Sequence, residues 1–161
     1  MKTTILKNPT IKNILSALAV AVFGFILLNL TFILYYFFHS FIIKILRLFV
    51  TIGPESGPRW LPPLIHFSFL VFIGFISWFV LKSKMKVLLK TIYMTVPLAV
   101  LFVTLGIFLY NWPIAVYSLG ALISAGILYY FYRTKQPWIY YYTLILVALA
   151  LAIMTLMGVE I

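Results

Sequence analysis

Five long apolar runs, separated by short polar and charged segments, dominate the pattern of this chain. Each run approaches or exceeds the length of about 20 mainly apolar residues that a helix needs to cross a bilayer. Both faces of each run are apolar, whereas a membrane β-strand would alternate apolar and polar side chains at every second residue. The pattern therefore predicts an all-α bundle of five transmembrane helices, at about residues 14–38, 61–81, 91–110, 112–132 and 138–158.

The segment SFIIKILRLFVT follows the first run and is too short to cross a bilayer. Its polar positions recur at intervals of four, three and four residues, at Ser40, Lys44, Arg47 and Thr51. This spacing places them on one face of a helix whose other positions are Phe, Ile, Leu and Val. We therefore expect an amphipathic helix over about residues 40–51, lying in the outer interface with its cations toward the headgroups.

The connection over residues 52–60 is rich in helix-breaking residues. Gly53 and Pro54 end the preceding helix, and Pro62 with Pro63 can open the second span because proline is tolerated in a first helical turn. One interpretation is a stiff corner that aims the second span. The other is an outward-facing loop that binds or docks a partner, since rigid loops often carry function.

Composition supports an integral membrane protein with a single domain over residues 1–161. Hydrophobic residues make up 65% of the chain and charged residues 9%, against about 45–50% and 25% in typical soluble domains. The formal net charge of +10 does not indicate nucleic acid, because the basic residues form short clusters between apolar runs. The absence of cysteine excludes disulfides, thiolate metal sites and nucleophilic thiols.

The distribution of Lys and Arg predicts how the chain is threaded. One side of the membrane would carry three clusters of cations, at Lys2, Lys7, Lys12, Lys82, Lys84, Lys86, Lys90, Arg133 and Lys135. The other side would carry only Lys44, Arg47 and Arg59. Because cytoplasmic loops carry the excess of positive charge, we expect the cytoplasmic membrane, with the N-terminus in the cytoplasm and the C-terminus outside.

The apolar runs carry little chemistry of the kind that enzymes use. No Lys, Arg, Asp or Glu lies at mid-depth in a predicted span, which weighs against proton-coupled transport and voltage sensing. No nucleophile with a His and acid partner, phosphate loop or metalloprotease motif is present. We therefore expect no catalytic residues and no metal site, and the chain leans away from an enzyme. The hydroxyl groups within the spans are expected to bond to their own or a neighbouring helix.

Two histidines, His39 and His66, lie at the outer end of the first and second spans. Imidazole is a common axial ligand of haem, so a haem b electron carrier is one hypothesis. The alternative is that both rings contact headgroups or cap helices. A zinc site would require further ligands, and Glu55 is the only acid nearby.

Other candidate ligand-binding residues lie mainly in the outer connection. They are Glu55, Arg59 and Trp60, with His66 just inside the second span and Asn29 within the first. Residues 58–63, PRWLPP, resemble the P-x-W-x-P-P that opens the second helix of the tryptophan-rich sensory, or translocator, protein family. The resemblance implies a five-helix fold that binds tetrapyrroles and other apolar ligands. It covers six residues, and the third span lacks that family's Asn and Trp pattern, so no ligand site is carried over.

Small residues at four-residue spacing predict close helix packing in lipid. The pairs are Gly120 with Ser124, Ala121 with Ala125, and Ala148 with Ala152. They would pack within the monomer, or form the interface of a homo-oligomer or of another membrane subunit. Pro97 is expected to kink the third span, because it removes the hydrogen bond to the carbonyl of Tyr93.

Three functions remain open from the sequence. The leading one is a non-catalytic accessory or scaffold subunit of a larger, transport-type membrane complex. The second is a binder or carrier of an apolar ligand or lipid, and the third is the haem protein described above. Besides the bilayer, the tyrosine-rich inner corner at residues 129–142, with Arg133 and Lys135, is a candidate site for anionic lipid.

Overall fold

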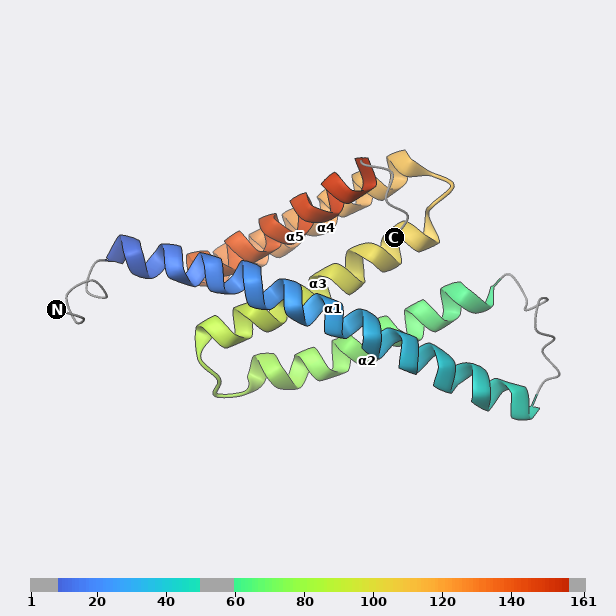
Figure 1. Cartoon of the computed structure of the whole chain (residues 1–161). Helices are drawn as coiled ribbons and strands as arrows, with labels where there is room; N and C mark the ends of the chain where they lie inside the picture. Colours follow the sequence, from blue (N-terminus) through green and yellow to red (C-terminus); the bar gives the residue numbers. More distant parts are fainter. Residues whose placement is uncertain (1–8, 50–59, 157–161) are drawn as a thin grey trace.

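A computed structural model describes residues 9–49 and 60–156 of the chain. These residues form an all-helical structure, as the sequence predicts (Figure 1). Its elements are α1 (Pro9–Phe49), α2 (Leu61–Lys82), α3 (Val87–Phe108), α4 (Pro113–Arg133) and α5 (Trp138–Leu156).

The helix α1 differs from the expectation of a span followed by a separate interfacial helix. It runs without a break for 41 residues, through the expected boundary at His39 and Ser40. The physical reason lies in the sequence, because no Gly or Pro occurs between Gly24 and Gly53. The separate helix over residues 40–51 is therefore not confirmed, and Thr51 with most of the connection 52–60 lies outside the described residues.

The starts of α2 and α4 follow the proline rule. Pro62 and Pro63 lie in the first turn of α2, and Pro113 is the first residue of α4. Proline suits this position because the first amide groups of a helix have no partner within the helix, and its fixed φ is helical. Both starts lie close to the boundaries that the sequence predicts.

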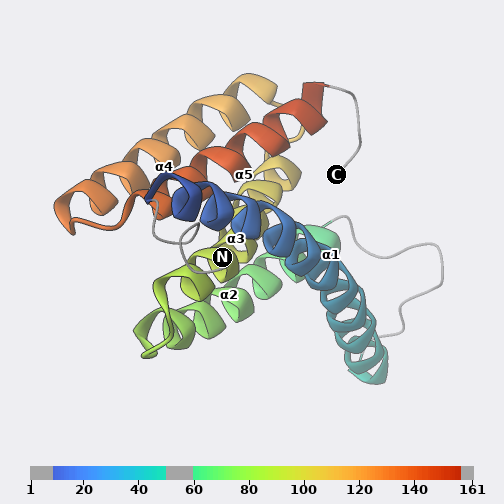
Figure 2. The same cartoon turned by 60° about the vertical axis from the view of Figure 1, so that its left-hand side comes forward.

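The helix α3 is the centre of the molecule. It contacts each of the other four described helices, whereas α2 makes no contact with α4 or α5. Figure 1 shows α1 crossing α3 and α2, with α4 and α5 side by side on one flank, and Figure 2 shows the same arrangement from another direction. The main core joins α1, α3, α4 and α5 around Val20, Leu98, Phe131 and Leu144.

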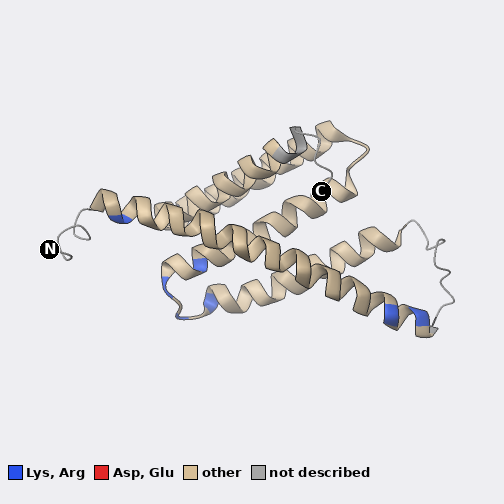
Figure 3. Ribbon diagram, in the orientation of Figure 1, with Lys and Arg blue, Asp and Glu red and all other residues tan. Residues whose placement is uncertain are grey.

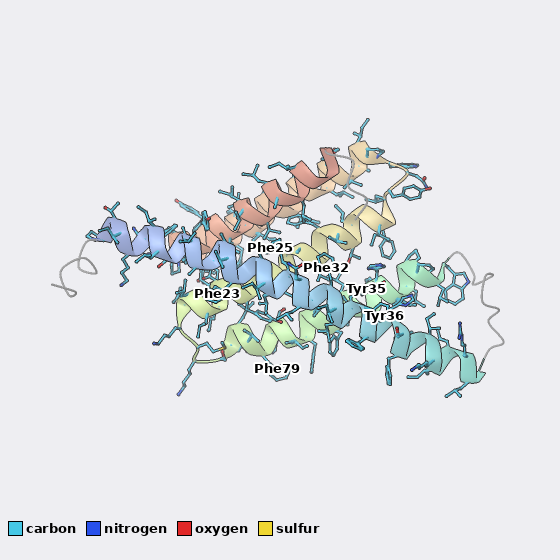
Figure 4. The ribbon with its side chains drawn as sticks, in the orientation of Figure 1. Phe23, Phe25, Phe32, Tyr35, Tyr36 and Phe79 are labelled. Atoms are coloured by element: carbon cyan, nitrogen blue, oxygen red, sulfur yellow. The ribbon has the colours of Figure 1, made fainter. Side chains whose placement is uncertain are left out.

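The surface of the bundle is apolar, as a lipid environment requires. Aromatic side chains such as Phe25 and Tyr36, 68% and 67% exposed, project outward from α1 (Figure 4). Four of the described helices, α1 to α4, are long and apolar enough to span a membrane. The described apolar part of α5, Trp138–Ile153, is shorter. These features support insertion into a membrane.

Basic residues gather at opposite ends of the helices. The beginning of α1 and the α2–α3 turn lie at one end of the molecule, and Lys and Arg near the end of α1 lie at the other (Figure 3). Between Lys12 and Lys44, α1 carries no charged side chain. This distribution agrees with helices that run from one membrane surface to the other.

Candidate functional site

The main cavity lies between the C-terminal half of α3, the N-terminal half of α4 and the C-terminal part of α5. Its volume is about 740 Å³. Aromatic and branched apolar residues supply most of its wall on α3, and small residues supply most of it on α4 and α5. The lining residues are Phe102, Val103, Leu105, Gly106, Ile107, Tyr110, Pro113, Val116, Tyr117, Gly120, Ala121, Ser124, Ala148, Leu151 and Ala152.

Two of the lining residues are glycines, and their lack of a side chain contributes to this space. A Cβ atom built on Gly106 would meet no atom within 4 Å, and one built on Gly120 would meet only Leu105 Cδ2, at 4.0 Å. Phe131 is the sole buried side chain that the structure describes on α4. The helix α4 is therefore buried near its C-terminal end, whereas its N-terminal half borders the cavity.

The polar groups of the cavity are three hydroxyls, on Tyr110, Tyr117 and Ser124. Tyr110 and Tyr117 are 75% and 49% exposed, and Ser124 is half-buried. No charged residue is among the described lining residues. The site can therefore accept a molecule that is mainly apolar and carries a small uncharged polar end.

Ser124 differs from the buried hydroxyls elsewhere in the bundle. As the sequence predicts, those hydroxyls donate to a carbonyl of their own helix, at Thr31, Ser77, Thr91, Thr95, Thr104 and Thr143. Within the described part of the chain, Ser124 makes no such bond. Its hydroxyl is left available to a bound molecule.

A second, smaller cavity lies beside His66, where α1, α2 and α3 meet. Its volume is about 50 Å³. Tyr35 stacks on His66 with ring centroids 4.3 Å apart, and it also approaches His39 at 6.0 Å. Figure 4 shows Tyr35 on α1 near the point where α1 passes α2. The ring of Tyr35 thus fills much of the space beside His66.

This geometry does not fit haem b. At about 50 Å³ the cavity is far smaller than the roughly 300–1,000 Å³ that is typical of ligand sites. One face of His66 is also covered by Tyr35. Among the described residues, no three His, Cys, Asp or Glu side chains form a group suited to a metal ion.

The predicted ligand residues are not brought together in the part of the chain that the structure describes. Glu55 and Arg59 lie outside that part. Trp60 is 61% exposed at the start of α2. Asn29 is also exposed, and its Nδ2 donates to the carbonyl of Phe25 at 2.8 Å. Of these candidates, only His66 lines a described cavity.

The small residues predicted for packing lie instead around the main cavity. Gly120, Ala121, Ser124, Ala148 and Ala152 line it, and Ala125 is exposed. Their role in an interface stays a prediction. Pro97 lines neither cavity, and α3 continues as one helix through it.

Sequence reasoning missed the wall that α3 contributes. Leu105, Gly106 and Tyr110 line the cavity, together with Tyr117 of α4. Gly106 was the available signal, because a glycine inside a helix away from its ends often marks a packing or functional need. Nothing in the sequence predicted that the ring of Tyr35 would stack on that of His66.

Comparisons of the chain with protein-family models, with curated proteins and with solved structures find no match. The resemblance of residues 58–63 to the translocator protein family is therefore not extended by a wider similarity.

Proposed function

We propose that this protein binds an uncharged, largely apolar molecule in the cavity between α3, α4 and α5. The observation that carries the proposal is the cavity itself, about 740 Å³ in volume. Ligand sites are typically about 300–1,000 Å³, with mostly apolar walls and a few polar groups that orient the ligand. Lipids with uncharged headgroups and other hydroxyl- or carbonyl-bearing amphiphiles fit this description.

The orientation of the ligand follows from the positions of the hydroxyls. Tyr110 and Tyr117 lie near the loop between α3 and α4, and Ser124 lies about two turns further along α4 than Tyr117. A polar end would bond to the tyrosines, and an apolar chain would extend past Gly120 toward Ala148. Tyrosine suits this place because its ring is apolar and its hydroxyl bonds to polar groups.

Replacing Gly120 by Leu tests the proposal. The new side chain would enter open space rather than clash, because Leu105 Cδ2 at 4.0 Å is the only atom near a Cβ at this position. We expect Gly120→Leu to weaken ligand retention by at least about 10-fold, a change of about 1.4 kcal/mol. The measurement is native mass spectrometry of protein gently extracted from its own membrane, with the small-molecule adduct quantified.

Gly126→Leu is the matched control. Gly126 lies on the same helix, a Cβ there also meets nothing within 4 Å, and the residue does not line the cavity. We expect this variant to keep the adduct. Equal retention by both variants would show that the ligand binds elsewhere, and a wild-type protein without any adduct would refute the function.

An accessory or scaffold subunit of a larger, transport-type membrane complex is the second candidate. The observation in its favour is that Ala121, at the edge of the cavity, and Ala125 are both exposed on α4 at the spacing used in helix–helix contacts. A second copy or another membrane subunit would pack there. The same mass measurement distinguishes this candidate, because it would detect additional protein chains in place of a small-molecule adduct.

For location, we propose the cytoplasmic membrane with five spans. The cations near the start of α1, in the α2–α3 turn and in the α4–α5 turn support a cytoplasmic position for that end of the bundle. With α5 as the fifth span, the C-terminus would lie outside. This assignment places the mouth of the main cavity in the outer half of the membrane.

A further inference from the structure

The α2–α3 turn is the most strongly charged part of the described surface. Four lysines fall within nine residues, at Lys82, Lys84, Lys86 and Lys90. No acidic side chain lies within the described residues, because the two acids of the chain are Glu55 and Glu160. The first turn of α3 has no acidic residue either. No carboxylate of the described chain therefore balances this charge.

The four lysines divide into two pairs with different surroundings. Lys82 Nζ lies 3.9 Å from the ring centroid of Trp78, and Lys90 Nζ donates to the carbonyl of Leu81 at 2.6 Å. These two cations are held against the end of α2. Lys84 and Lys86 are exposed and make no hydrogen bond or ion pair through their side chains within the described part of the protein.

The backbone of the turn is well held, so it presents Lys84 and Lys86 from a defined base. The Ser83 amide donates to the carbonyl of Phe79 at 3.0 Å, and the Ser83 hydroxyl donates to the carbonyl of Val80 at 2.7 Å. The Met85 amide in turn donates to Ser83 Oγ at 3.4 Å.

Trp78 indicates the depth of the turn in the membrane. It is 60% exposed and lies one helical turn before the end of α2. Tryptophan is enriched at the level of the lipid headgroups. With Trp78 at that level, the ammonium groups of Lys84 and Lys86 would lie at or just beyond the layer that contains the lipid phosphates.

We propose that the α2–α3 turn binds the phosphate of an anionic phospholipid in the leaflet that it faces. Lys84 and Lys86 would contact the phosphate, and Lys82 and Lys90 would add positive potential from their fixed positions. The lipid chains would lie along the exposed apolar face of α2. This site is at the opposite end of α3 from the main cavity, so it does not depend on the function proposed above.

The test is a titration of purified protein, in an uncharged detergent, with short-chain phosphatidylglycerol, followed by native mass spectrometry. Phosphatidylcholine with the same chains is the zwitterionic comparison, and inorganic phosphate is the competitor. We expect Lys84→Gln combined with Lys86→Gln to weaken phosphatidylglycerol binding by about 30-fold, the effect of two basic residues near an anionic surface.

Two further variants control for charge and for folding. Lys44→Gln with Arg47→Gln removes the same charge at the other end of the molecule and should change binding less than about 3-fold. Lys84→Arg with Lys86→Arg keeps the charge and should keep the binding. Equal losses in the two neutralised pairs, or equal binding of phosphatidylcholine, would overturn the proposal. Displacement of the lipid by inorganic phosphate would instead assign a site for small anions.

Discussion

Gly24 lies where α1 packs tightly against α3. A Cβ atom at this position would lie 2.7 Å from Thr95 Cγ2 and 3.3 Å from Thr95 Oγ1. Real Cβ atoms do not approach other heavy atoms to 2.7 Å, so only glycine permits this contact without movement. The sequence shows that Gly24 is a glycine within an apolar run, but it does not show which helix lies against it.

We expect Gly24→Ala to destabilise the protein by about 1–3 kcal/mol, the usual cost of overpacking a core. Thermal unfolding in detergent, followed by circular dichroism, would measure the change. Gly74→Ala is the matched control, because a Cβ at Gly74 meets nothing within 4 Å and alanine favours helix over glycine. A second change, Thr95→Ser, removes the clashing methyl group and should recover part of the loss. No recovery would mean that the clash is not the cause.

Among the elements, the corner between α4 and α5 is closed by backbone hydrogen bonds. The Gln136 amide donates to the carbonyl of Phe131 at 2.9 Å, and the Lys135 amide donates to that of Tyr132 at 3.1 Å. Together these bonds form the Schellman arrangement that ends many helices. Lys135 has a φ of 51°, in the left-handed region where glycine is usual.

Lys135→Gly should therefore stabilise the corner by about 1 kcal/mol, because glycine avoids the steric cost of the left-handed conformation. Thermal unfolding of the variant in detergent would show the increase. Lys135→Ala is the control, because it removes the same charge and keeps the steric cost. If alanine stabilises the protein as much as glycine does, the effect belongs to charge and not to the backbone.

The elements also show which parts of the sequence are informative. Pro62 and Pro63 predicted the start of α2 closely, and the beginning of an apolar run predicted that of α4, since these signals act within about one turn of the chain. The boundary expected after residue 38 failed because polar periodicity at Ser40, Lys44 and Arg47 changes the face of a helix and not its continuity. A helix ends where its backbone hydrogen bonds are interrupted, and that segment contains no Gly or Pro to interrupt them.

At the scale of the whole molecule, hydropathy alone does not distinguish the central helix from the peripheral ones. The run that forms α3 is less apolar than those that form α1 and α2, yet α3 contacts all the other described helices. By contrast, α4 buries only Phe131 among its described side chains. Hydropathy and residue size do not predict the cavity either. Small residues on α4 and α5 indicate that another helix can pack closely against them, but whether it does depends on how α3, α4 and α5 are arranged together.

The threading of the chain can be tested directly because the protein has no cysteine. Single replacements Lys12→Cys, Lys84→Cys and Lys44→Cys would be labelled in spheroplasts with a membrane-impermeant maleimide. We expect labelling of Lys44→Cys alone, since positive charge marks the cytoplasmic side. All three should react after permeabilisation. External labelling of Lys84→Cys would reverse the assignment, and an external C-terminal tag would support α5 as the fifth span.

The length of α1 has a mechanical consequence. From Lys12 to Lys44 the helix rises about 48 Å, whereas a bilayer with its headgroups measures about 40–45 Å. Keeping both cations among the headgroups requires the axis to lean by about 20–35°. A thinner membrane increases that lean and a thicker one reduces it. Because α1 packs against α3 at Gly24, a change in the tilt of α1 would also act on α3. The thickness of the surrounding membrane would therefore affect the centre of the bundle.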